Sequence, residues 1–248
     1  MLANLSWPGG LLYFVVSLSL ELITLDGPVA VGKSSVGSLL SRRLGFCFFD
    51  TGLIYRAFTW RVIQAGLSSE DEGGLCHLAA TTKFEFVAGQ GGRLSVHVDG
   101  KDVSSKLTRS EVEEEVALVS KVAGVREKMV SEQRRVAQKG KLVMAGRDIG
   151  TVVLPWADLK VFMVASVEAR AMRRYTELLE RSRKADYDVV LAELKRRDDN
   201  DIHRAISPLK AAPDAVTIDT EKLSLEQVVG RIYSLAVRLG TGAAPSGL

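Results

Sequence analysis

The chain has 248 residues, a length that suits one large domain or a core with an inserted subdomain. Its 33 basic and 30 acidic residues give a formal net charge of +3, which is too balanced to favour nucleic acid as the main partner. Charged residues at 25% and hydrophobic residues at 46% are ordinary for a folded soluble protein. Cys47 and Cys76 lack metal-ligand spacing and provide no disulfide framework, so we expect reduced thiols in a cytoplasmic protein.

The first 25 residues contain an apolar run that resembles a signal peptide or a membrane anchor. No Lys or Arg precedes this run, so the positive region of a signal peptide is missing. Glu21 interrupts the run before it reaches the roughly 20 residues that a membrane-spanning helix needs. We therefore expect residues 1–20 to be a disordered or accessory extension without stable membrane association. A peripheral membrane role for Leu11–Leu20 remains the alternative.

A phosphate-binding loop follows the strand-like segment Leu22–Asp26. The loop reads Gly-x-x-x-x-Gly-Lys-Ser, and a helix-forming segment continues to Leu44. Backbone N–H groups in such a loop face an anion, Lys33 brings a charge to the outer phosphates, and Ser34 offers a hydroxyl to Mg²⁺. We expect the triphosphate of ATP to contact Gly27, Pro28, Val29, Ala30, Val31, Gly32, Lys33, Ser34 and Ser35. The loop alone does not separate kinases from GTPases or ATPases.

The next segments alternate between strands and helices, with one interruption. Phe46–Phe49 is a predicted buried strand that ends in Asp50-Thr51-Gly52, before a helix that begins with Leu53. Residues 83–103 alternate apolar and polar residues around two glycine turns, which predicts an antiparallel hairpin or a three-stranded sheet. We interpret this part of the chain as an inserted subdomain. Residues 110–138 have a helical pattern, with a predicted break at Gly124.

The second half of the chain returns to the alternating pattern. Strands are predicted for residues 141–145, 159–164 and 215–219, and helices for residues 168–183, 187–200 and 225–239. The first of these strands is followed directly by Gly146-Arg147-Asp148, which places two charged residues at the edge of the sheet where ligands bind in doubly wound folds. The fold class predicted is an α/β P-loop kinase, with a parallel sheet flanked by helices. We expect a core over residues 21–239, an acceptor-binding insert over about 66–123, a lid over about 168–186 and a flexible tail from 240.

Arginines are placed where phosphoryl transfer needs them. The reaction requires two substrates held in line and cations around the moving group, and a nucleoside monophosphate is already largely ionised at pH 7. Arg56, Arg147, Arg197 and Arg204 lie after strand ends or in loops, whereas Arg170, Arg173 and Arg174 share one helix. A solvated helix surface is the alternative for that helix, but beside a phosphate loop it predicts a cationic lid. We interpret His77, His97 and His203 as structural or surface residues.

The sequence resembles the bacterial cytidylate kinases over residues 22 to about 238. The matching segments are Ile23-Thr-Leu-Asp-Gly-Pro through Ser34, Asp50-Thr51-Gly-Leu-Ile-Tyr55-Arg56, Asp99-Gly-Lys-Asp-Val103, Gly146-Arg-Asp-Ile-Gly-Thr-Val-Val153 and Lys195-Arg-Arg-Asp-Asp-Asn-Asp201 through Arg204-Ala. The resemblance implies Mg²⁺-dependent transfer of the γ-phosphoryl group from ATP to CMP or dCMP, catalysed by a monomer.

Residue roles follow from the same resemblance. It implies that Thr51, Arg56, Arg147 and Arg204 bind the CMP phosphate and its surroundings, and that Arg197 and Asp201 contact the ribose. The cytosine readers would be Ser120, Arg126 and Asp148, because cytosine offers an amino donor and ring acceptors. Lys33, Arg147, Arg170, Arg173, Arg174 and Arg204 are the expected catalytic residues, and Ser34 is the expected metal ligand.

Two positions depart from the family's pattern. The family has an Asp before Gly-Arg-Asp, where this chain has Ala145, and the segment between Ala123 and Val125 is a few residues shorter than usual. We expect the chain to remain catalytically active despite these two differences, and we expect the selectivity for the base to be the property that they change. Rival functions are a kinase for another nucleotide or metabolite, and a GTPase-like switch. The chain lacks the Asn/Thr-Lys-x-Asp motif that reads guanine, which argues against the switch.

Overall fold

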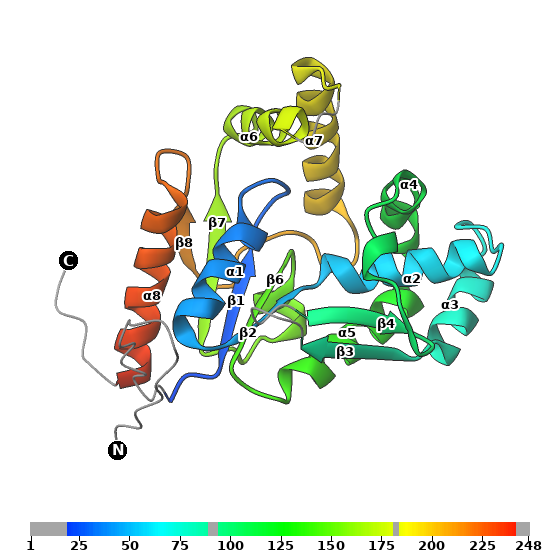
Figure 1. Cartoon of the computed structure of the whole chain (residues 1–248), viewed down its shortest axis with the longest axis horizontal. Coiled ribbons are helices and arrows are strands. Elements are labelled where there is room, and N and C mark those ends of the chain that lie inside the picture. Colours follow the sequence, from blue (N-terminus) through cyan, green and yellow to red (C-terminus); the bar gives the residue numbers. More distant parts are fainter. Residues whose placement is uncertain (1–18, 89–93, 181–183, 242–248) are drawn as a thin grey trace.

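The computed structural model describes residues 19–88, 94–180 and 184–241 (Figure 1). The expected tail beyond residue 241, most of the expected extension and the predicted lid residues Arg181 and Arg183 lie outside these ranges. Within them, none of the helices combines the length and the apolar character that crossing a membrane requires. Leu20 is only 2% exposed, and the Ser19 N–H donates to the Gly240 carbonyl at 3.3 Å, so the packed structure already includes these two residues.

A five-stranded parallel sheet forms the centre of the molecule (Figure 1). Its strands lie in the order β2-β6-β1-β7-β8. Their bounds are β1 Leu22–Asp26, β2 Cys47–Asp50, β6 Leu142–Gly146, β7 Leu159–Val164 and β8 Val216–Asp219. All neighbouring strands in the described sheet are parallel, so their carboxyl ends meet at one edge. The predicted parallel sheet is confirmed, and each predicted strand differs from the observed one by at most a residue at either end.

Helices cover both faces of this sheet and extend beyond its carboxyl edge. They are α1 Lys33–Leu44, α2 Gly52–Gln64, α3 Glu72–Thr81, α4 Ser110–Val119, α5 Ala123–Ala137, α6 Val167–Glu180, α7 Tyr187–His203 and α8 Leu225–Thr241. Two short turns add a 3₁₀ segment, η2 Ser104–Lys106, and a π-helical segment, η3 Ile149–Val153. In Figure 1, α6 and α7 lie above the ends of the sheet strands, at the top of the view.

The predicted β-rich insert is a three-stranded antiparallel sheet. Its strands are β3 Phe84–Ala88, β4 Leu94–Val98 and β5 Lys101–Asp102. The ring of Phe86 on β3 packs edge-on against the ring of Phe49 on β2, with centroids 5.0 Å apart. Buried residues of the insert therefore belong to the same hydrophobic core as one face of the central sheet. A second core lies between the other face and helices α1 and α8, and a third, small core joins α6 to α7.

Two local features differ from the sequence-based expectation. The break between α4 and α5 lies at residues 120–122, whereas Gly124 is in the first turn of α5. A Cβ on Gly124 would lie 2.6 Å from the Cys76 sulfur, so this glycine permits close packing of α5 against α3. The segment η3 was not predicted, because Ile149–Val153 shows no helical period. Both differences reflect tertiary packing rather than local propensity.

Candidate active site

The phosphate-binding loop joins the end of β1 to the start of α1, as the sequence predicts. Its Gly32 has a φ of 100°, a left-handed conformation that favours glycine, and directly precedes Lys33 at the helix N-terminus. A Cβ on Gly27 would lie 2.3 Å from the Met163 carbonyl oxygen, so the first glycine allows the loop to pass close to β7. The sequence pattern thus produces a glycine-framed helix N-terminus suited to phosphate.

Lys33 is buried inside this loop. Its Nζ donates to the carbonyls of Gly27 and Pro28, both at 2.6 Å. Burial and the nearby Arg147 guanidinium lower the pKa of Lys33 well below its usual range. An anionic phosphate beside Nζ would favour the charged form, because an opposite charge stabilises an ammonium group.

Ser34 contacts a carboxylate at the end of the neighbouring strand. The Ser34 hydroxyl donates to Asp50 Oδ2 at 2.6 Å, which leaves its oxygen lone pairs available to a cation. Asp50 is further fixed because its Oδ1 accepts the Gly52 N–H at 2.9 Å. Among the described residues, no three His, Cys, Asp or Glu side chains are grouped so that they could hold a metal ion. A hydroxyl beside one carboxylate nevertheless fits Mg²⁺, which takes few protein ligands and coordinates mainly phosphates and water.

Arg126 on α5 and Asp148 after β6 form a buried ion pair at the carboxyl edge of the sheet. Their side chains are 4% and 8% exposed, and Arg126 Nη2 donates to Asp148 Oδ2. Arg126 Nη1 also donates to the Ser120 carbonyl at 3.3 Å. The three residues expected to read cytosine therefore come together, although Ser120 contributes its backbone oxygen here and its hydroxyl donates to Ala117.

Tyr55 of α2 lies beneath this ion pair. The Arg126 guanidinium carbon is 5.5 Å from the centroid of the Tyr55 ring, a cation–π distance. Burial raises the pKa of Tyr55 to about 12, so its hydroxyl stays protonated at neutral pH. Tyr55 therefore supports the guanidinium of an ion pair that offers both donor and acceptor atoms, as recognition of a flat heterocycle requires.

Arg204 lies at the other side of Asp148 and joins it to Asp201. Its guanidinium nitrogens are 3.8 Å from a carboxylate oxygen of Asp148 and 3.8 Å from one of Asp201. Asp201 also accepts from Arg147 Nε at 2.7 Å. Two of the three expected phosphate-binding arginines, one ribose residue and the base-reading Asp148 are therefore neighbours. Burial and the nearby Arg126 lower the pKa of Arg204.

Arg56 and Thr51 lie at the start of α2, beside the same edge. A Cβ on Gly52 would be 3.2 Å and 3.3 Å from the two terminal nitrogens of Arg56, so the guanidinium lies over this glycine. The Thr51 hydroxyl donates to the Ala145 carbonyl at 2.9 Å and ties α2 to the end of β6. Arg197, in contrast, is bound to Glu193 on its own helix at 2.6 Å and is not brought to Asp201.

Several of these arginines keep buried nitrogens that no protein atom accepts. They are Arg56 Nε, Arg126 Nε and Arg204 Nη2. A buried donor without an acceptor is unfavourable, so such a group calls for a partner that the protein itself does not supply. Arg126 and Arg204 lie beside Asp148, and Arg56 lies near the N-terminus of α2, over Gly52, so the unsatisfied donors at this edge would suit an anionic ligand rich in acceptors.

The arginines of α6 have a different environment. Arg170 is 4% exposed and forms a two-pronged ion pair with Asp198 of α7, with distances of 3.1 Å and 2.5 Å. It also donates to the Val29 carbonyl in the phosphate loop at 3.1 Å. Arg173 donates to the Thr220 carbonyl at 2.6 Å, and Arg174 pairs with Glu177 at 2.9 Å. Helix α6 is therefore docked on the loop through Arg170.

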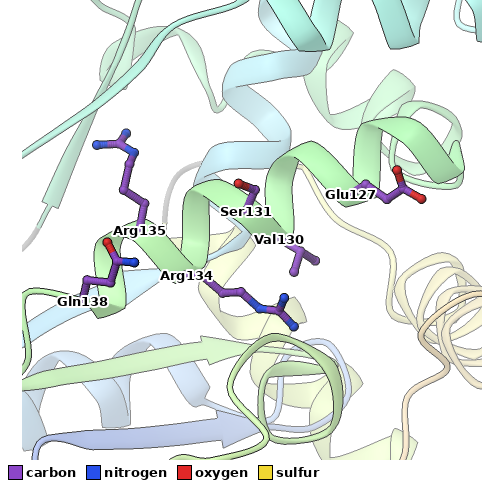
Figure 2. Close-up of a pocket in the computed structure, with 6 residues that line it drawn as sticks. All are labelled: Glu127, Val130, Ser131, Arg134, Arg135 and Gln138. Atoms are coloured by element: carbon purple, nitrogen blue, oxygen red, sulfur yellow. The ribbon is translucent and has the colours of Figure 1, made fainter.

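A shallow hollow of about 560 Å³ lies elsewhere, along the other face of α5 (Figure 2). Its lining residues are Glu127, Val130, Ser131, Arg134, Arg135 and Gln138. Arg134 is already used there, since it donates to the carbonyls of Val152 and Val153 at 2.9 Å and 3.0 Å. The hollow does not include the phosphate loop or the Asp148 edge and does not belong to the candidate active site.

The family model for cytidylate kinases matches residues 23–238, which includes every element of this site. The chain belongs to the cytidylate kinase family. A cytidylate kinase of Geobacillus sp. (strain WCH70) is 44% identical over 213 residues, covering 86% of this chain and 95% of the relative. A cytidylate kinase of Bacillus pumilus (strain SAFR-032) is 43% identical over 218 residues, covering 88% and 96%.

Solved structures overlap with this chain only loosely. A shikimate kinase from Bacteroides thetaiotaomicron overlaps with a TM-score of 0.46 at 13% identity, covering 87% of this chain and 97% of that one. Neither the TM-score nor the identity indicates which acceptor the chain uses. The assignment to the family therefore depends on the family model and the sequence relatives.

The candidate site also contains residues that the sequence alone did not single out. Asp50 binds the Ser34 hydroxyl, Tyr55 supports Arg126, and Asp198 holds Arg170. Asp50 and Tyr55 lie in a segment that resembles the family, so their position after a buried strand was an available signal. Asp198 had no such signal, because only the packing of α7 against α6 reveals its partner.

Proposed function

We propose that this protein transfers the γ-phosphoryl group of ATP to CMP or dCMP and releases ADP with CDP or dCDP. The observation that carries the proposal is the buried Arg126–Asp148 pair beside a phosphate loop. Asp148 would accept the cytosine amino group, and Arg126 would donate to the ring nitrogen and carbonyl. Uracil has a carbonyl where cytosine has the amino donor, so an acceptor would face the Asp148 carboxylate in place of a donor.

The acceptor phosphate would be held by Arg56, Arg147 and Arg204, with Thr51 supporting the start of α2. Arginine suits this role because its planar fork binds phosphate oxygens in pairs. Asp201 and Arg197 would contact the ribose, for which Arg197 would have to leave Glu193. Ser120 would assist in base recognition.

An oxygen of the CMP phosphate forms the new bond to the γ-phosphorus as the bond to the ADP oxygen breaks. No general base is required, because the second pKa of a phosphate is about 6.

On the donor side, residues 27–35 would hold the phosphates of ATP, with Lys33 beside the moving group. Arg170, Arg173 and Arg174 would add positive charge from α6. Mg²⁺ would be held by Ser34 together with Asp50, and it would supply charge neutralisation between the β- and γ-phosphates. We further propose a cytoplasmic monomer, in keeping with the free thiols of Cys47 and Cys76.

A coupled assay with CMP, dCMP, UMP and AMP as acceptors tests the proposal. We expect the highest kcat/KM for CMP and dCMP, and a value at least tenfold lower for UMP and AMP. Preference for AMP or for a non-nucleotide acceptor would overturn it, and the protein would then be a P-loop kinase with another acceptor. The assay is repeated without Mg²⁺ and with EDTA, where we expect activity to be lost.

A further inference from the structure

The last residue of β1, Asp26, is a buried carboxylate to which neither the phosphate loop nor the acceptor residues assign a role. It is 5% exposed and directly precedes Gly27. Its Oδ1 accepts the Ile149 N–H at 2.8 Å, and its Oδ2 accepts the Gly150 N–H at 2.7 Å. One side chain thus binds two consecutive backbone donors across the edge of the sheet.

Those two donors begin the segment η3, which immediately follows Arg147 and Asp148. The first N–H groups of a helical segment have no partner within the segment, and a carboxylate is a favoured acceptor for them. Asp26 therefore connects two parts of the site. It lies where β1 enters the phosphate loop, and it holds the backbone that carries Arg147 and Asp148.

The contact between Asp26 and the two amides also depends on the glycine at position 150. A Cβ on Gly150 would lie 3.3 Å from Asp26 Oδ2 and 3.0 Å from the Thr24 hydroxyl, which is closer than side chains ordinarily approach. A glycine at this position leaves room for the carboxylate to reach both amides. The pairing of β1 with β6 does not need the Asp26 side chain, because four residue pairs, from Leu22↔Leu142 to Leu25↔Ala145, already align the two strands before Asp26.

Keeping a charge at this buried position is costly. Burial raises the pKa of Asp26 to about 6, despite the two amide hydrogen bonds that lower it. The charged groups near it are Asp148 after β6, Lys33 on α1 and, through its aliphatic stem beside Gly150, Lys160 on β7. The buried Asp26 carboxylate disfavours folding, yet it binds two specific amides. Its presence is therefore better explained by the residues that these amides hold in place, Arg147 and Asp148.

We propose that Asp26 is a positioning residue that fixes the Arg147–Asp148 segment against the phosphate loop, so that the acceptor lies in line with the donor. This inference rests on the proposed function, because it takes Arg147 and Asp148 to bind CMP. It predicts that loss of the carboxylate weakens acceptor binding more than donor binding.

The substitution Asp26→Asn tests this in the full-length protein. Asparagine keeps the shape, but its NH₂ group would face one of the two amide donors instead of accepting from it. We expect the KM for CMP, and the Kd for CMP measured by calorimetry without ATP, to rise at least tenfold. The KM and Kd for ATP should stay within threefold. Thr24→Val is the matched control: it lies two residues earlier on the same face of β1, and both affinities should stay within twofold.

Gly150→Ala perturbs the same contact from the other side and serves if Asp26→Asn does not fold. We expect the same asymmetry, with CMP binding weakened more than ATP binding. Unchanged affinities in both variants, or an equal loss for CMP and ATP, would overturn the inference. Failure of the proposed function is distinguishable, because the wild-type protein would then not use CMP at all.

Discussion

The arginines at the strand ends and the arginines of α6 carry the same charge but have different surroundings. Arg56, Arg126 and Arg204 each retain a buried nitrogen that no protein group accepts. Arg170 uses all three of its nitrogens on Ala165, Val29 and Asp198. The first group keeps donors free for a ligand such as the one proposed above, whereas Arg170 binds the protein itself and connects α6, α7 and the phosphate loop. Counting arginines in a sequence does not separate these two uses.

The largest expected effect comes from the strand-end group. Asp148→Asn leaves Arg126 buried beside a neutral partner and removes the charged acceptor for the cytosine amino group. We expect kcat/KM for CMP to fall on the order of 10³-fold. Steady-state kinetics measures this, and a circular dichroism spectrum checks that the variant is folded. A loss below tenfold in a folded variant would mean that Asp148 does not read the base.

Arg170 provides the contrasting case. Arg170→Met leaves Asp198, whose side chain is only 15% exposed, without its cation, so we expect the free energy of unfolding to fall by roughly 3 kcal/mol. The double variant Arg170→Met/Asp198→Leu replaces both charges and should recover most of that stability in urea unfolding. We expect kcat to remain at least tenfold reduced, because the cation beside the loop is gone. Full recovery of kcat would show that Arg170 serves folding alone.

Asp26 should give an effect on stability of about the same size as that of Arg170, but one that depends on pH. Its pKa is raised from 3.8 to about 6, so the folded state holds this proton more tightly than the unfolded chain does. The stabilisation is fully present below about pH 4 and is lost as the pH rises through about 6. We expect the difference in unfolding free energy between the wild type and Asp26→Asn to fall by roughly 3 kcal/mol over this range. A difference that is constant with pH would contradict the shift.

The smallest effect is expected for an arginine that belongs to neither group. Arg61 and Asp99 form an ion pair at 2.9 Å between α2 and the insert, with side chains 31% and 42% exposed. Water and salt screen such a pair, so Asp99→Asn should change the unfolding free energy by less than about 1 kcal/mol. We expect kcat/KM for CMP to stay within twofold. Asp99→Asn is the matched control for Asp148→Asn, since each substitution neutralises an aspartate that is paired with an arginine.

The helices and strands of the fold were predictable because apolar residues recur along them with a clear helical or strand period. The apolar run at Leu159–Val164 and the alternation around Val96 have no competing interpretation, and both strands are confirmed. The π-helical segment after Asp148 was not predictable from its own residues, and its first two N–H groups donate to the carboxylate of Asp26, more than a hundred residues earlier in the chain. Resemblance to the family brought Arg126 and Asp148 into consideration, but their burial is visible only in the packed structure. The catalytic and binding roles assigned to the site residues, including those of Arg197, Arg173 and Arg174, stay predictions.

The division of the apolar interior has a consequence for how the molecule opens. The insert shares its core with the central sheet through the contact of Phe86 with Phe49, whereas α6 and α7 are joined by a small separate core to which only Val29 and Ala30 of the phosphate loop add. Segments with few shared apolar contacts open at a lower free energy than the whole domain. Amide hydrogens of β3 and β4 should therefore exchange with solvent only when the entire domain unfolds, and those of α6 and α7 should exchange earlier. The arginine-bearing helices would then form an independent cooperative unit, while the acceptor side stays preorganised.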